Sequence, residues 1–170
     1  MRQSVAFSVM LVREAMHVAL KSVNAALDQD AASTAAVAIT ASDVYVSGGT
    51  RNATLRKASM DAFRVGQTIV SGPMFHALHA ASAASGAAFL HPPGDTTDAH
   101  QTKHILGAAV HFVLCHEVSA RESVAAIDAV VKRAPDEIKE LLRMYPQPVG
   151  GKQRYGAVQV MLYIAITQSE

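Results

Sequence analysis

The sequence predicts an α+β fold, in which a mainly helical domain includes a small antiparallel β-sheet. Three observations predict it. Residues 3–29 contain no proline or glycine and repeat apolar side chains every three or four positions. Residues 35–47 hold two short β-branched runs around a turn, and residues 157–167 contain strictly alternating apolar side chains. The chain is expected to form one domain, residues 1–170, because no repeat or linker divides it.

The first predicted helix spans residues 3–29. Its apolar face is expected to consist of Val9, Val12, Met16, Ala19, Leu20, Val23 and Leu27. The runs AAVAIT and VYVS follow, separated by the Asp-containing segment ASD. This arrangement predicts a β-hairpin over residues 35–47.

A second helix is predicted from Asn52, whose side chain can cap it, to about Val70. Its buried stripe is expected to consist of Leu55, Ala58, Ser59, Ala62, Gly66, Ile69 and Val70. The small residues in this stripe indicate that another element approaches closely. Ser71-Gly72-Pro73 marks a break, and residues 74–88 predict a weaker helix rich in alanine, serine and glycine.

The second half of the chain predicts further helices separated by loops. Residues 91–97 form a loop, and a helix is expected from residue 97 or 98 to residue 117. Ser119 and Glu122 form a capping-box pattern that opens the next helix. Pro135 suits the first position of another helix, and residues 147–152 form a second loop.

The final segment supports two interpretations. Residues 157–167 alternate as a strand does, yet Gln159, Tyr163 and Thr167 are also spaced by four as on a helix. We favour the strand because five β-branched or leucine residues alternate without interruption. A strand here would pair with the hairpin to close the sheet.

Composition excludes several classes of function. The net charge is +1, and no run of basic residues demands a polyanionic partner. A basic patch of Arg51, Arg56, Lys57 and Arg64 lacks neighbouring aromatic residues, so nucleic-acid binding is not expected. The apolar runs are shorter than a membrane span. A lone cysteine and the lack of an export signal predict a cytoplasmic protein.

The segment SGGTR suggests a candidate anion site. Two glycines before a capped helix place backbone N–H groups beside a positive helix end, with two arginines nearby. The site would use Gly48, Gly49, Thr50, Arg51 and Arg56. The alternative is an ordinary turn, because neither GxxxxGK[ST] nor GxGxxG is present.

The histidines suggest a candidate metal site. A helical wheel places His100, His104 and His111 on one stripe, and His76 and His79 lie three residues apart on another predicted helix. The alternative is a solvated stripe, because it lies opposite the apolar face and no HExxH pattern occurs.

No catalytic constellation is recognised. Cys115 and His116 are adjacent, so on a helix they point about 100° apart and cannot act as nucleophile and base. No serine lies in GxSxG, and the sequence identifies no cofactor. The sequence therefore predicts a non-catalytic protein that binds itself, as a homo-oligomer, and another protein. The alternatives are a ligand- or nucleotide-binding domain using SGGTR and a metal-binding protein using the histidines.

Overall fold

The computed structural model describes residues 1–22, 29–91, 100–117 and 120–169, and in those ranges the chain is an all-α single domain without β-strands. Eight α-helices and one 3-10 turn make up the described part. They are α1 (Arg2–Lys21), α2 (Gln29–Val46), α3 (Ala53–Thr68), α4 (Pro73–Gly86), η1 (Ala87–Phe89), α5 (His100–His116), α6 (Ala120–Arg133), α7 (Asp136–Arg143) and α8 (Arg154–Gln168).

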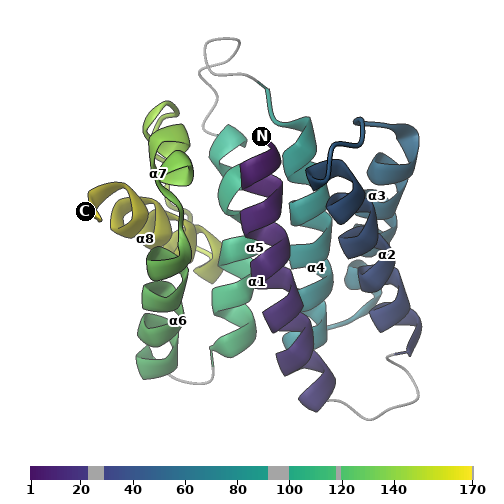
Figure 1. Ribbon diagram of the computed structural model, residues 1–170. Helices are drawn as coiled ribbons and strands as arrows, with labels where there is room; N and C mark the ends of the chain where they lie inside the picture. The colour runs from purple at the N-terminus through teal and green to yellow at the C-terminus, as the bar shows by residue number, and fades with distance from the viewer. Residues whose placement is uncertain (23–28, 92–99, 118–119, 170) are drawn as a thin grey trace.

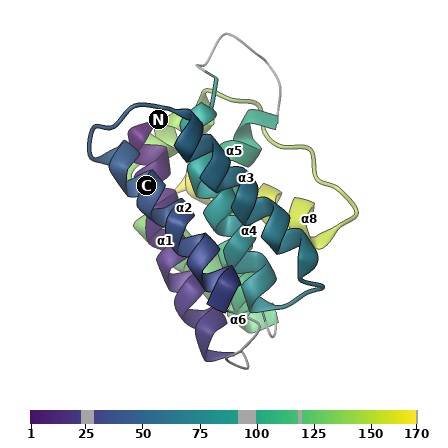
Figure 2. The same cartoon turned by 90° about the vertical axis from the view of Figure 1, so that its right-hand side faces the viewer.

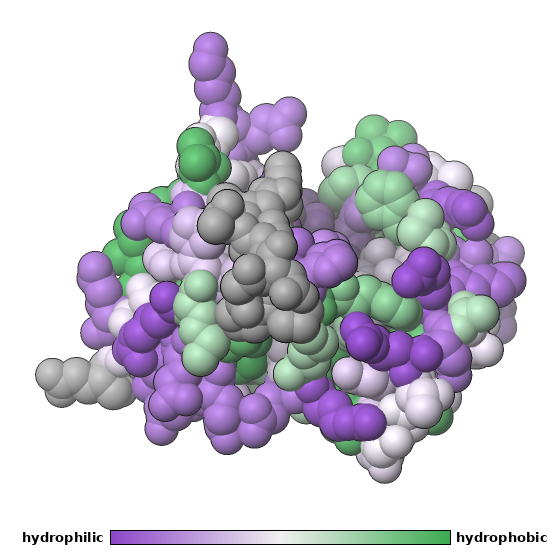
Figure 3. All heavy atoms as spheres, turned by 90° about the horizontal axis from the view of Figure 1, so that it is seen from above, coloured by the Kyte–Doolittle hydropathy of each residue, from purple (hydrophilic) through white to green (hydrophobic). Residues whose placement is uncertain are grey.

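The helices are arranged around a central group formed by α1, α4 and α5 (Figure 1). On one side α2 and α3 pack against α4, and on the other α6 and α8 pack against α5. Figure 2, which turns the α2 and α3 side toward the viewer, shows these two helices as an outer layer. Viewed from above, the surface is mainly hydrophilic, with separate hydrophobic areas (Figure 3).

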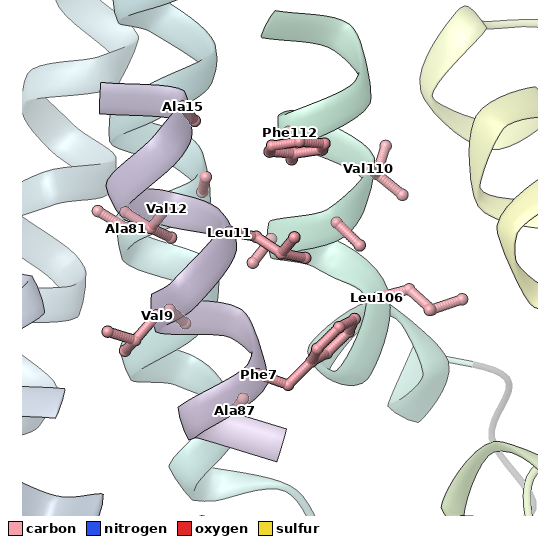
Figure 4. Packing of buried hydrophobic residues seen from close by; sticks show 14 of the residues in the cluster. Phe7, Val9, Leu11, Val12, Ala15, Ala81, Ala87, Leu106, Val110 and Phe112 are labelled. Carbon is pink, nitrogen blue, oxygen red and sulfur yellow. The ribbon is translucent and has the colours of Figure 1, made fainter. Parts of the chain in front are cut away.

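The core lies between α1, α4 and α5. Phe7 and Leu11 extend from α1 toward α5, where Leu106 and Phe112 lie buried (Figure 4). Burying one such large apolar side chain stabilises the fold by roughly 1.5–3 kcal/mol. On α4 the buried positions are mostly alanines, which lets α1 and α3 approach it closely.

The predicted hairpin over residues 35–47 is wrong, because these residues belong to α2. The inward face of α2 repeats with helical spacing and consists of Ala31, Ala35, Ala38, Ser42 and Tyr45. The outward face also lacks charge, so no polar stripe reveals the helical period of 3.6 residues. Two short β-branched runs on a helix that is apolar on both sides therefore resembled two strands.

The favoured strand over residues 157–167 is also wrong, because this segment lies in α8. Its buried residues, Val158, Gln159, Leu162 and Ile166, follow a helical repeat. The other apolar residues of the alternating pattern are only partly covered, and Ile164 is 37% exposed. The helical interpretation based on Gln159, Tyr163 and Thr167 is the one that the structure adopts. With both strand segments helical, the predicted α+β class is corrected to all-α.

The remaining elements agree more closely with the sequence. Asn52 caps α3 by accepting a hydrogen bond from the backbone N–H of Leu55 at 2.9 Å, as predicted. The helix predicted over residues 3–29 ends earlier, at Lys21, where the Ser22 backbone N–H and hydroxyl both bond to the carbonyl of Ala19. Residues 92–97 of the loop predicted at 91–97 lie outside the described residues, and so does the predicted capping residue Ser119.

Candidate functional sites

The glycines of the predicted anion site terminate α2. The N–H of Gly49 bonds to the carbonyl of Val44 at 2.9 Å, and the N–H of Gly48 bonds to that of Tyr45 at 3.2 Å. This pair of bonds is a Schellman motif, in which Gly48 takes the left-handed position with φ of 114°. Both amides are therefore already used by the helix that precedes them.

The other residues of the SGGTR site point to different roles. The guanidinium of Arg2 donates to the carbonyl of Tyr45, so this end of α2 presents carbonyl oxygens to a cation. Arg56 lies over the ring of Phe89, with its guanidinium carbon 4.7 Å from the ring centroid. Thr50 and Arg51 are exposed. The anion-binding prediction stays a prediction. In the structure the amides of Gly48 and Gly49 bond to carbonyls of α2, and the guanidinium of Arg56 lies over Phe89.

Three of the predicted histidines meet between α4 and α5. The Nδ1 atoms of His76 and His111 lie 3.1 Å apart, within hydrogen-bonding distance. The ring of His79 stacks on that of His111, with centroids 5.2 Å apart and planes inclined by 21°. Phe75 contacts all three rings. The sequence placed these residues on two helices but could not show that the helices pack together.

These histidines are held in the neutral state. Burial, together with the proximity of His76 and His79, lowers the pKa of His111 to about 3. Burial is also the main cause that lowers the pKa of His76, and it lowers that of His79. The Nε2 atom of His79 is buried and has no hydrogen-bond partner among the described residues, and a Cβ added at Gly66 would lie 3.1 Å from it.

The metal-site prediction stays a prediction. The rings of His79 and His111 contact each other face to face, with planes inclined by 21°, whereas His76 and His111 approach through their Nδ1 atoms. Among the described residues no group of three histidine, cysteine or carboxylate side chains could hold a metal ion. His104 lines the neighbouring pocket, and the side chain of His100 lies outside the described residues.

A pocket of about 260 Å³ adjoins the cluster, and we call it the histidine pocket. Side chains from four helices line it: Phe63 from α3, His79 from α4, Lys103, His104 and His111 from α5, and Tyr155 from α8. No pattern in the sequence indicates that Phe63 and Tyr155 belong here. Tyr155 lies just before residues 157–167, which were predicted as a strand, so its place in the first turn of a helix was not expected.

The start of α8 is fixed by an ion pair that positions Tyr155. Arg154 donates from Nε to Glu117 at 2.8 Å and from Nη2 to the hydroxyl of Ser123 at 2.8 Å. The hydrogen bond from Arg154 is the main cause that lowers the pKa of Glu117. These contacts tie α8 to α5 and α6, so Tyr155 enters the pocket from a fixed helix end.

Cys115 has the environment of a structural residue. Its thiol is buried and lies 3.5 Å from the carbonyl oxygen of Ala15 and 3.6 Å from that of Pro73. Burial raises its pKa to about 12, so the reactive thiolate is not populated near neutral pH.

The outer face of α2 forms a second candidate site. No charged residue occurs between positions 31 and 42, although this helix lies at the surface. The outward side chains follow helical spacing, and we call them the α2 stripe: Ser33, Ala36, Val37, Thr40, Ala41 and Val44. Val37 and Val44 are 56% and 58% exposed.

A groove of about 430 Å³ runs along this stripe. The whole α2 stripe lines it, and Thr50, Asn52 and Leu55 line its side toward α3. Asp43 lies within this span of α2 and forms an ion pair with Arg13 of α1 at 2.7 Å. The other nearby charges stand beyond the two ends of the stripe. Asp30 lies in the first turn of α2, and Arg51 follows its last turn.

Comparisons with protein-family models, with curated proteins and with solved structures find no significant match for this chain. Among the helices that the structure describes, none is long and apolar enough to cross a membrane.

Proposed function

We propose that this chain is a non-catalytic protein that works by binding other protein chains, and that its first partner is a second copy of itself. The observation that supports the proposal best is the uncharged, exposed α2 stripe beside an apolar groove. A helix that is apolar on both faces is expected to be covered on both faces. The buried thiol of Cys115 suits a reducing compartment, and we place the protein in the cytoplasm as part of this proposal.

Small side chains make the stripe suitable for helix packing. Alanine, serine and threonine at i, i+3 and i+4 spacing allow two helix axes to approach closely, and the two valines fill the gaps between them. The groove beside the stripe has a mainly apolar lining and offers few hydrogen bonds to a small polar ligand. It therefore fits the side of another helix better than it fits a substrate.

Charge complementarity favours a second copy as the occupant. In a two-fold symmetric pair each copy uses the same patch, and two α2 helices that cross antiparallel bring opposite ends together. The acidic end carries Asp30, and the opposite end carries Arg51. Neither residue forms an ion pair with a described residue of its own chain. Two such pairs would flank the uncharged stripe and fix its register.

Sedimentation equilibrium on purified protein tests this proposal. The wild-type chain should fit a monomer–dimer equilibrium, and Val37→Asp should weaken dimerisation by at least about a hundredfold, because it places like charges together at an apolar contact. Val70→Asp is the matched control, since Val70 is 97% exposed and lies outside the groove. A wild-type monomer throughout, or equal effects of the two variants, would contradict the proposal.

A further inference from the structure

The histidine pocket has the properties of a ligand site that is independent of the α2 stripe. It opens where α3, α4, α5 and α8 converge, whereas the stripe faces outward from α2. Its volume of about 260 Å³ is slightly below the range of roughly 300–1,000 Å³ for drug-sized ligands. An occupant would therefore be a small molecule.

The charge of the lining favours an anion. Among the described residues that line the pocket, Lys103 is the one lysine or arginine, and none is an aspartate or glutamate. Lys103 is exposed at the pocket and forms no ion pair with a described residue. His79 and His111 do not oppose this charge or add to it at neutral pH, because burial lowers both pKa values.

A hydrogen-bond donor, the Tyr155 hydroxyl, lines the same pocket. The hydroxyl of Tyr155 would be 3.7 Å from a Cβ at Gly107, and Gly107 lies one helical turn after Lys103 on the same side of α5. The hydroxyl forms no hydrogen bond with a described residue. Burial raises the pKa of Tyr155 to about 12, so the phenol stays protonated near neutral pH and its O–H can donate a hydrogen bond.

Planar side chains form the rest of the wall. The ring of Phe63 meets that of His79 edge-on, with centroids 5.2 Å apart. His111 lies between His79 and Tyr155, and its centroid is 5.2 Å from each of theirs. Such rings suit a flat, aromatic body better than a flexible aliphatic chain.

We propose that the histidine pocket binds a small aromatic carboxylate, whose carboxylate group is held by Lys103 and the Tyr155 hydroxyl and whose ring lies against the histidines and Phe63. The ammonium supplies the charge, and the phenol supplies a directed hydrogen bond. His79 and His111 act as a neutral, flat wall and exchange no proton with the ligand.

Benzoate is the probe that tests this inference, and isothermal calorimetry with NMR of the histidine ring protons provides the readout. Benzoate should bind in the millimolar range or tighter and shift the signals of His79 and His111. Lys103→Ala and Tyr155→Phe should each weaken binding about tenfold or more, because each removes one contact to a charged group. Neutral benzamide should bind more weakly than benzoate, and acetate, which lacks the ring, should also bind more weakly.

Lys57→Ala is the matched control, because Lys57 is an exposed lysine on α3 that does not line the pocket. It should leave benzoate binding unchanged. The absence of benzoate binding to the wild-type chain would overturn the inference. So would equal binding of benzoate and benzamide, or full affinity in both pocket variants when circular dichroism shows that they are folded.

Discussion

The Nδ1 atoms of His76 on α4 and His111 on α5 lie 3.1 Å apart, so the two rings form a hydrogen-bonded pair between these helices. Such a pair needs one donor and one acceptor, and therefore at least one ring must be neutral. Protonation of both rings would bring two N–H groups and two positive charges together. Lowering the pH should therefore weaken the contact between α4 and α5 that this histidine pair forms.

Lowering the pH is expected to destabilise the fold through His111. Its pKa is lowered to about 3, whereas a histidine in the unfolded chain titrates near ~6.5. Because the unfolded chain takes up the proton first, this contribution is complete above about pH 6.5 and is lost as the pH falls toward 3. At pH 4 we expect the protonation of His111 in the unfolded chain to lower the free energy of unfolding by about 3 kcal/mol.

Urea unfolding at pH 7 and at pH 4 measures this effect. Carboxylates also contribute to acid sensitivity, so the informative quantity is the difference between the wild-type chain and His111→Gln. This variant should lose less stability than the wild type between the two pH values. His17→Gln alters an exposed histidine on α1 and should behave as the wild type does. Equal pH dependence in wild type and His111→Gln would refute the assigned role of His111.

Substitution of Gly48 is expected to destabilise the end of α2. With φ of 114°, Gly48 adopts a backbone conformation that an L-residue with a side chain rarely takes. Gly48→Ala should lower the unfolding free energy by about 1 kcal/mol. Ser47→Ala, at the exposed neighbouring position, should have little effect. Thermal unfolding compares the two variants, and equal melting temperatures would show that the Schellman motif contributes no stability.

Cys115 is expected to react slowly in the folded protein. Its thiol is buried, and burial raises its pKa to about 12. The reaction with 5,5′-dithiobis(2-nitrobenzoate) at pH 8 should therefore be slow in buffer and fast in denaturant. Modification in buffer as fast as in denaturant would place Cys115 in an accessible environment instead.

The sequence predicts an element correctly where the two faces of a helix differ in polarity. On α3 the buried stripe through Leu55 and Ala62 faces away from Arg56 and Lys57, so the helical period is visible. On α2 and α8 both faces are largely apolar. Without polar residues to mark the outer side, β-branched side chains suggested strands, although tertiary packing decides in favour of helices.

The candidate site was predictable only in part for a similar reason. Helical spacing placed His76 beside His79, and it placed His104 and His111 on one stripe of their helix, because such relations are local. The contact between His76 and His111 depends on how α4 packs against α5, and no local pattern specifies that packing. Tyr155 joins the pocket through α8, whose start is fixed by the ion pair between Arg154 and Glu117.

Exchanging the charges of Asp30 and Arg51 should first weaken and then restore the proposed pairing of two copies through α2. Sedimentation equilibrium would compare the wild-type chain with Asp30→Arg, Arg51→Asp and the double variant that carries both changes. We expect a wild-type dimer, weaker dimerisation in each single variant and recovery in the double variant, because opposite charges again face each other. A monomeric wild-type chain, or a double variant weaker than both single variants, would contradict it.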